Sequence, residues 1–289
     1  MESNIIRVQR YRFSGKRRAV SKKICNFVPE MSTVIYPSPI FGPIHSRRLG
    51  VSLGINLLPA DGKVCSFDCI YCECGLNAER HPNQKMPTRE EVCAALEARL
   101  QQMQAEGPRP DVFTFAGNGE PTLHPHFAEI INDTIRLRNQ YFPEARISVL
   151  SNATQILKPN VFAALCRVDN NILKLDTVDM DFIHAVDRPT GHYFVEAIVE
   201  GLIRFRGHVI IQTMFLCGTD ADGRDITNTS DHFVKPWLEA LSLIGPQQVM
   251  IYTIDRETPV STLCKAQPET LDAIAQRVRD LGLTCSVAY

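Results

Sequence analysis

The chain has 289 residues, of which 44% are hydrophobic and 22% are charged. That length allows one large α/β domain or two small ones, and the apolar content is sufficient for a sizeable core. No run of about 18 apolar residues occurs, which excludes a membrane-spanning helix, and the basic N-terminus lacks the apolar run of a secretory signal. We therefore expect a cytoplasmic protein whose ten cysteines are free thiols or metal ligands.

The formal net charge of −1 hides an uneven distribution. Residues 1–30 hold eight Lys and Arg against two acidic residues, which leaves 23 basic and 30 acidic residues in the rest of the chain. A domain that neutralises many phosphates needs a basic face, because counterion release drives the binding. Nucleic acid is therefore a disfavoured partner. The unpatterned composition of residues 1–35 predicts a disordered basic extension, and residues 36–289 then form the core domain.

Apolar segments alternate with amphipathic segments along the body of the chain. The β-branched, nearly continuous apolar runs are typical of buried parallel strands, and the segments between them favour helices. The predicted strands are 51–58, 111–116, 146–151, 171–176, 208–216 and 248–254. The predicted helices are about 88–105, 125–139, 159–168, 193–206, 231–244 and 268–281, the first opening on a capping box from Thr88 to Glu91.

Six strand–helix units in series predict an α/β fold with one parallel sheet and right-handed crossovers. Six units are too few to close an eight-stranded barrel, so we predict a partial, open (βα)6 barrel of the TIM type. Ligands of such folds lie at the carboxyl ends of the strands. Polar residues at those ends are therefore the candidates for a functional site.

Three cysteines, Cys65, Cys69 and Cys72, lie in one loop after the first predicted strand. Thiolates are soft ligands that favour iron–sulfur clusters and zinc. A C-x3-C-x2-C loop supplies three of the four ligands of a cubane and leaves one iron free for a substrate or cofactor. The alternative is a non-catalytic zinc or iron–sulfur module with Cys74 as a fourth thiolate. It is disfavoured because a C-x-C spacing is tight for two ligands of one tetrahedral ion.

The cysteine spacing, with Tyr71 just before the last cysteine, resembles the signature of the radical S-adenosylmethionine (SAM) superfamily. The resemblance implies a [4Fe–4S] cluster on Cys65, Cys69 and Cys72 and SAM as cosubstrate, with Tyr71 over the adenine. In that family an electron from the cluster splits SAM into methionine and a 5′-deoxyadenosyl radical. The resemblance also implies an electron donor such as flavodoxin or ferredoxin.

A glycine-rich turn, residues 117–122, follows the second predicted strand and resembles the Gly-Gly-Glu-Pro element of the same family. The resemblance implies that Gly119 and Glu120 bind the methionine ammonium of SAM. Asn118 stands where a second glycine is common. By the same resemblance, further strand-end residues contact the ribose and carboxylate of the cofactor: Ser151, Asn152, Lys174 and Asp176.

Polar residues at strand ends do not by themselves require a ligand. Ser, Asn and Asp at these positions also favour turns. Gln212 and Thr213 interrupt an apolar predicted strand, and a buried polar group must find a partner, for which a ligand is one candidate. Arg47 and Arg48, before the first strand, are candidates to face an anionic cofactor, although adjacent arginines usually belong to a solvated face.

Longer strings, among them Phe41-Gly42-Pro43 and Asp255-Arg256, resemble the wybutosine-synthase-like branch of Fe–S oxidoreductases over roughly 36–260. That branch implies transfer RNA as substrate and, in its archaeal form, an additional upstream cysteine set. Here Cys25 is the one cysteine upstream of the loop, so we rank tRNA-base modification second to radical chemistry on an unidentified substrate. Three weaker candidates for catalysis remain, namely Cys217, Cys264 and Arg256; the two cysteines also fit the role of ordinary loop residues.

Overall fold

A computed structural model describes residues 34–46 and 50–289 of the chain. Contacts divide the chain into two compact units, Met1–Glu30 and Met31–Tyr289, and everything below concerns the second. Apart from its last two residues, the predicted basic extension lies outside the described residues, as do Arg47 and Arg48. The backbone N–H of Val34 donates a hydrogen bond to the carbonyl of Glu73 at 2.9 Å.

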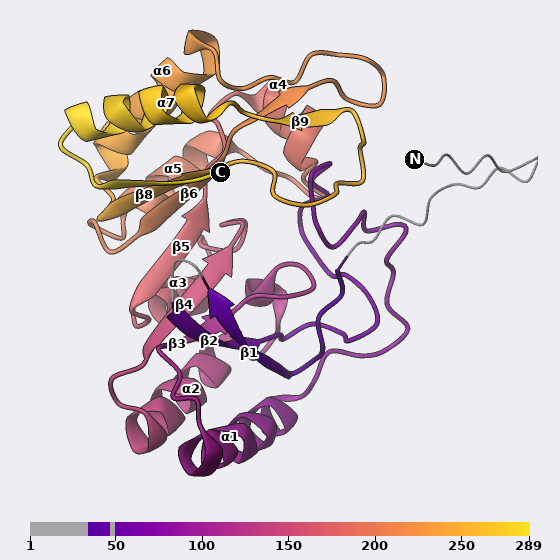
Figure 1. Ribbon diagram of the computed structural model, residues 1–289, viewed down its shortest axis with the longest axis vertical. Helices are drawn as coiled ribbons and strands as arrows, with labels where there is room; N and C mark the ends of the chain where they lie inside the picture. Colours follow the sequence, from indigo (N-terminus) through magenta and orange to yellow (C-terminus); the bar gives the residue numbers. More distant parts are fainter. Residues whose placement is uncertain (1–33, 47–49) are drawn as a thin grey trace, which may run out of the picture. The chain divides into compact units, whose positions relative to one another are not determined.

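One curved sheet forms the centre of the molecule, as Figure 1 shows. Its strand order is β1-β2-β3-β4-β5-β6-β8-β10, so β1 and β10 are its two edges. The first strand, β1 (Ile40–Ser46), is antiparallel to β2 (Gly50–Ile55). All further pairings in this sheet are parallel and run through β3 (Val112–Phe115), β4 (Arg146–Ser151), β5 (Asn170–Lys174), β6 (Ile210–Met214), β8 (Gln248–Tyr252) and β10 (Cys285–Ala288).

Helices connect successive parallel strands and cover the outer face of the sheet (Figure 1). The side chains of Leu53, Phe113 and Ile147 are fully buried in the core between sheet and helices. The helices are α1 (Arg89–Glu106), α2 (Phe127–Tyr141), α3 (Pro159–Leu165), α5 (Val195–Ile203), α6 (Asp231–Ile244) and α7 (Pro268–Asp280). The predicted open parallel barrel is thereby confirmed, and the capping box of Thr88 and Glu91 starts α1.

The structure adds elements that the sequence pattern does not indicate. The last strand, β10, follows α7 and extends the six predicted units by a seventh parallel strand. The predicted strand 208–216 ends at Met214, because the chain turns at Phe215 into β7 (Leu216–Gly218), which pairs with β9 (Leu263–Lys265). Three short helical segments also occur, namely η1 (Pro121–Leu123), α4 (Met180–Phe182) and η2 (Ile183–Asp187).

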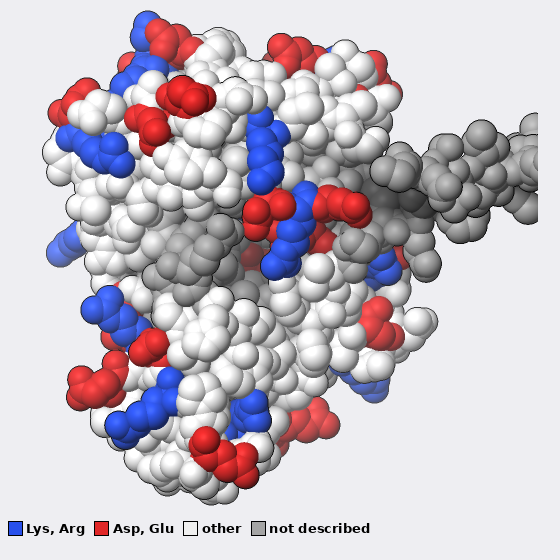
Figure 2. Space-filling model, viewed as in Figure 1, with Lys and Arg blue, Asp and Glu red and all other residues white. Residues whose placement is uncertain are grey.

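The charged surface of the described residues is mixed in sign. Figure 2 shows basic and acidic side chains interspersed over the face drawn there, with no continuous basic stripe among the described residues of that face. Arg89 pairs with Asp133 at 2.7 Å and Arg277 with Asp231 at 2.7 Å. No helix in the described part of the chain is both long enough and apolar enough to span a bilayer.

Candidate active site

The loop between β2 and α1 carries the three cysteines and is fixed by backbone hydrogen bonds on two sides. On one side Val64 forms a parallel bridge with Gly119: the Val64 N–H donates to Asn118 O at 2.9 Å and the Glu120 N–H donates to Val64 O at 3.0 Å. On the other side the Ile70 N–H donates to the carbonyl of Val186 in η2 at 2.9 Å. We call the segment 62–75 the cluster loop. It is held between the carboxyl end of β3 and the segment that follows β5.

The glycine-rich turn after β3 leaves no room for a side chain at Gly119. Gly119 has φ +125°, and a Cβ there would lie 2.0 Å from the carbonyl oxygen of Val64, so only glycine allows the bridge to the cluster loop. The neighbouring residue in this turn, Asn118, is fully buried. Its side-chain amide donates to Pro59 O at 2.7 Å and to Tyr36 O at 2.9 Å, and its oxygen accepts from the Tyr36 N–H at 2.7 Å. These bonds give Asn118 a structural role at the position where a second glycine is common.

Glu120 is a buried carboxylate that joins the ends of β3 and β4. Its side chain accepts hydrogen bonds from the N–H and hydroxyl of Thr122, at 3.0 and 2.5 Å, and from the N–H of Asn152 at 2.6 Å. Burial raises the pKa of Glu120, while these bonds and one with Ser151 oppose the rise. The Asn152 amide also donates to Cys65 Sγ at 3.5 Å. The structure thus brings the predicted residues Gly119, Glu120, Ser151 and Asn152 together beside the cluster loop.

A second group of predicted residues meets around the phenol of Tyr71. The Lys174 ammonium donates to the Tyr71 oxygen and, at 3.2 Å, to Asp176. The Tyr71 hydroxyl contacts both Asp176 and Asp187, the latter at 3.1 Å, and its one proton can be donated to one of them at a time. Burial, followed by the negative charge of Asp176, raises the pKa of Asp187 to about 7.

Asp187 is not among the predicted site residues. It belongs to η2, and its carboxylate also accepts a hydrogen bond from the thiol of Cys69 at 3.6 Å. Apolar periodicity cannot reveal such a residue, because a single acidic side chain in a segment without strand or helix pattern normally indicates a solvated loop. Its only sequence signal is the short distance along the chain from Lys174 and Asp176.

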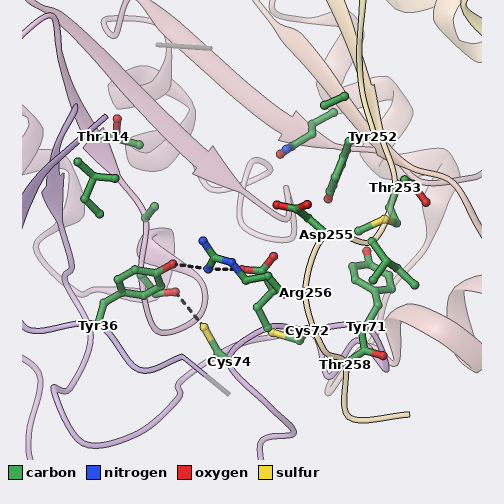
Figure 3. A pocket seen from close by; sticks show the side chains of 18 of the residues that line it. Tyr36, Tyr71, Cys72, Cys74, Thr114, Tyr252, Thr253, Asp255, Arg256 and Thr258 are labelled. Atoms are coloured by element: carbon green, nitrogen blue, oxygen red, sulfur yellow. Dashed lines mark hydrogen bonds and ion pairs between the residues drawn. The ribbon is translucent and has the colours of Figure 1, made fainter. Parts of the chain in front are cut away.

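A cavity of about 480 Å³ opens at the carboxyl ends of the strands, next to the cluster loop (Figure 3). Tyr71, Cys72 and Gln212 line it. Thr213 does not line it, because its hydroxyl donates to Leu175 O at 2.8 Å inside the core. Arg256 lines the cavity too, and its guanidinium donates to Glu73 at 2.9 Å and to the Tyr36 hydroxyl at 3.3 Å.

The sequence profile of the Radical SAM superfamily matches residues 61–241, which span the cluster loop and five of the strands described above. This chain belongs to the radical SAM superfamily. A UPF0026 protein of Helicobacter pylori is 31% identical over 224 residues, 76% of this chain and 67% of that protein. A UPF0026 protein of Methanocaldococcus jannaschii is 32% identical over 68% of this chain and 59% of its own length. The matched region therefore covers about two thirds or less of these relatives.

Solved structures of radical SAM enzymes share the fold at low sequence identity. A radical SAM methyltransferase from Sphaerobacter thermophilus superposes with a TM-score of 0.59 at 16% identity, over 82% of this chain and 66% of that one. Streptococcus suis SuiB bound to S-adenosylmethionine superposes with a TM-score of 0.57 at 14% identity, over 81% of this chain and 50% of that one. Membership in the superfamily implies radical chemistry that depends on SAM and a [4Fe–4S] cluster.

The thiols of this radical SAM protein occupy unlike environments. Burial, with the charge of Glu120 second, raises the pKa of Cys65 to about 12, and burial together with Asp187 raises that of Cys69. A hydrogen bond from Cys74, aided by the positive charge of Lys63, lowers the pKa of Cys72. Within residues 34–46 and 50–289, no three His, Cys, Asp or Glu side chains converge closely enough to hold a single metal ion.

The donor set of the cluster loop fits an anionic iron–sulfur cluster. Three soft thiol ligands lie on one loop, and the ammonium of Lys63 is buried with them. Burial lowers the pKa of Lys63, but the negative charges of Cys72, Cys65, Cys69 and Asp68 outweigh burial and raise it. Lys63 is thus a buried positive charge on the same loop as the three cysteines, and a neighbouring positive charge favours the thiolate form that binds iron.

The remaining two candidates, Cys217 and Cys264, lie on β7 and β9. They are directly opposite each other in the antiparallel register of this small sheet. Neither is among the described residues that line the cavity, whereas Cys74 does line it and contacts Gly117 O at 3.5 Å. These two cysteines lie outside the cavity wall, although their neighbours Leu216 and Leu263 pack in one apolar cluster with Tyr71 of the cluster loop.

Proposed function

We propose that Cys65, Cys69 and Cys72 bind a [4Fe–4S] cluster and that the enzyme cleaves SAM reductively to abstract hydrogen from a substrate held in the cavity. One observation carries the proposal: the C-x3-C-x2-C loop is anchored at the carboxyl edge of the sheet, and its last cysteine lines the cavity. Reductive cleavage of SAM to methionine and a 5′-deoxyadenosyl radical is the chemistry that the bound cluster supplies in this superfamily. The protein's own residues bind, orient and shield the reactants.

Two hydrogen-bonded groups are proposed to hold SAM. The first, Gly119 and Glu120 with Ser151 and Asn152, would receive the methionine end, because the buried carboxylate of Glu120 suits an ammonium. The second, Tyr71 with Lys174 and Asp176, would receive the nucleoside, together with Gln212, which lies opposite Lys174 in the register of β5 and β6 and lines the cavity. Support comes from their position, since both groups flank the cluster loop.

A substrate is not assigned by these observations, and small molecules, peptides, partner enzymes and RNA remain open. The wybutosine-synthase-like strings in the sequence favour tRNA-base modification as a second candidate. The interspersed charges on the face in Figure 2 speak against a polyanion on that face. We also propose a cytoplasmic location and reduction by a flavodoxin or ferredoxin, the usual electron source for this kind of chemistry.

The test is anaerobic reconstitution of the full chain with iron and sulfide. We expect about four irons per chain, a brown colour, and 5′-deoxyadenosine on addition of SAM and a strong reductant. A colourless protein that binds one zinc would instead support the non-catalytic module. A brown protein that yields no 5′-deoxyadenosine would overturn the enzymatic proposal. Comparison of metabolites and tRNA nucleosides from cells with and without the gene would then identify the substrate class.

A further inference from the structure

Lys63 is a buried cation at the start of the cluster loop. Its side chain is 1% exposed, although lysine is almost never fully buried unless it is paired. The carboxylate of Asp68 lies 3.5 Å from the ammonium and is itself committed to the N–H of Asn77 at 2.7 Å. Asp68 therefore offsets the charge of the ammonium only in part, because the same carboxylate oxygen also accepts from Asn77.

The backbone around Lys63 is fixed, so the ammonium cannot easily leave. The Lys63 N–H donates to Arg80 O at 2.7 Å, and a Cβ on the preceding Gly62 would lie 2.5 Å from the same oxygen. From this anchor the side chain reaches across the loop, and its ammonium donates to Gly75 O at 2.8 Å. Lys63 and Gly75 enclose all three cysteines, so one hydrogen bond joins the beginning of the ligand-bearing segment to its end.

The place of the ammonium identifies its second role. It donates to Gly75 O, and the Gly75 N–H donates to Cys72 O at 2.9 Å, so the positive charge is fixed at the turn that carries the last cysteine. A cubane held by three thiolates is anionic, and each reduction adds a further negative charge. In a buried, low-dielectric site a fixed neighbouring cation stabilises the more negative state and so raises the reduction potential.

We infer that Lys63 is a positioning residue that closes the cluster loop and sets the reduction potential of the cluster through its fixed positive charge. The inference rests on the proposed function of Cys65, Cys69 and Cys72 as cluster ligands. Lys63 is not a cluster ligand, but by this inference its charge makes reduction of the cluster more favourable. A purely structural lysine would hold the loop equally well but would leave the potential unchanged.

Three variants of the full chain distinguish the effect of the positive charge of Lys63 from the effect of its side-chain size. Lys63→Met keeps the length of the side chain and removes its charge, and Lys63→Arg keeps the charge. Lys85→Met is the matched control, because Lys85 is an exposed lysine of the same connection between β2 and α1. Each protein is reconstituted anaerobically, and its iron content, the melting temperature of the apo form and the midpoint potential of the cluster are measured.

We expect Lys63→Met to make reduction at least tenfold less favourable, a shift of about 59 mV to more negative potential for one electron. Lys63→Arg and Lys85→Met should stay close to wild type. If Lys63→Met binds no cluster, retention of the cluster by Lys63→Arg still supports the role of the charge. An unchanged potential in Lys63→Met, or loss of the cluster from both Lys63 variants, would overturn the inference. A wild-type protein without a cluster would instead contradict the proposed function itself.

Discussion

Val64 and Gly119 pair backbone to backbone in a parallel bridge, one residue before the first cysteine of the cluster loop. This contact makes the cluster loop and the glycine-rich turn one unit. A change in the turn should therefore affect the proposed ligands, although Val64 and Gly119 lie more than 50 residues apart in the sequence.

Gly119→Ala should break that bridge. The added Cβ would lie 2.0 Å from Val64 O, and φ +125° is unfavourable for alanine, so we expect a loss on the order of 1–3 kcal/mol and impaired cluster binding. Thermal denaturation and iron content check this. Gly191→Ala is the control, since a Cβ there meets no atom within 4 Å. Equal melting temperatures of the two variants would show that the loop accommodates the methyl group.

Alanine at Cys65, Cys69 or Cys72 should abolish the broad visible absorption of the reconstituted protein, because a cubane then lacks a ligand. Cys74→Ala should keep it, although Cys74 hydrogen-bonds to Cys72 and lines the cavity. Iron and sulfide analysis of the four variants is the measurement. Loss of the cluster from the Cys74 variant would require a different ligand assignment.

Glu120→Gln keeps the size of the side chain but removes its negative charge. The new amide NH2 group is a donor, and it would face either the N–H of Asn152 or the N–H of Thr122, which are donors as well. We expect a loss on the order of 1–3 kcal/mol in SAM binding, which is roughly five- to 150-fold in affinity. Binding titrations with SAM test this, with Glu144→Gln as a control at an exposed glutamate. The cluster content should not change. Unaltered SAM affinity would remove Glu120 from the cofactor site without touching the family assignment.

Stability should depend on pH through His124. Its Nδ1 accepts from the N–H of His126 at 3.2 Å and its Nε2 lies 2.8 Å from Pro87 O, an arrangement that needs the neutral ring with its proton on Nε2. Burial lowers the pKa of His124 below its usual 6.5. As the pH falls, His124 of the unfolded chain is therefore protonated before His124 of the folded protein. The contribution of His124 to the free energy of unfolding is complete above about pH 6.5 and is lost as the pH falls through the pKa of the folded state.

Melting temperatures of the apo protein between pH 7.5 and 5.5 measure this effect. Asp187, whose pKa is raised to about 7, gives wild type and His124→Gln the same gain in stability as the pH falls, so His124 is tested by the difference between the two proteins. The stability advantage of wild type over His124→Gln should shrink over that window. His192→Gln, at an exposed histidine, should follow wild type. Parallel curves for wild type and His124→Gln would exclude His124 as the titrating group.

A chain that begins at Met31 should fold with an unchanged melting temperature and keep its cluster. The basis is the basic, unpatterned composition of residues 1–30. Removal of Cys25 with this segment should leave the iron content at about four per chain. A fall of several degrees would mean that the segment contributes about 1 kcal/mol or more to the folded core.

The parts of the fold that the sequence predicts are those with strong apolar patterns. Strands such as β3, whose residues Val112–Phe115 are all buried, and helices with a clear start such as α1 are predicted to within a few residues. The strand β10 is not predicted, because its four residues are only half-buried and carry no continuous apolar run. The cysteine loop is evident from its spacing. Asp187 and Lys63 are not, since a buried charge is recognisable only after distant segments have been brought together.

The edge strands β1 and β10 both line the cavity, through Phe41 and Ile44 on one side and Ala288 on the other. The open side of the sheet, between β1 and β10, thus borders the cavity in which we propose that the substrate is held. The distance between β1 and β10 depends on the curvature of the whole sheet. Helices packed on the outer face of the sheet, such as α2 and α3, stabilise that curvature. A substitution between those helices, far from any reacting atom, would therefore alter which substrates can enter.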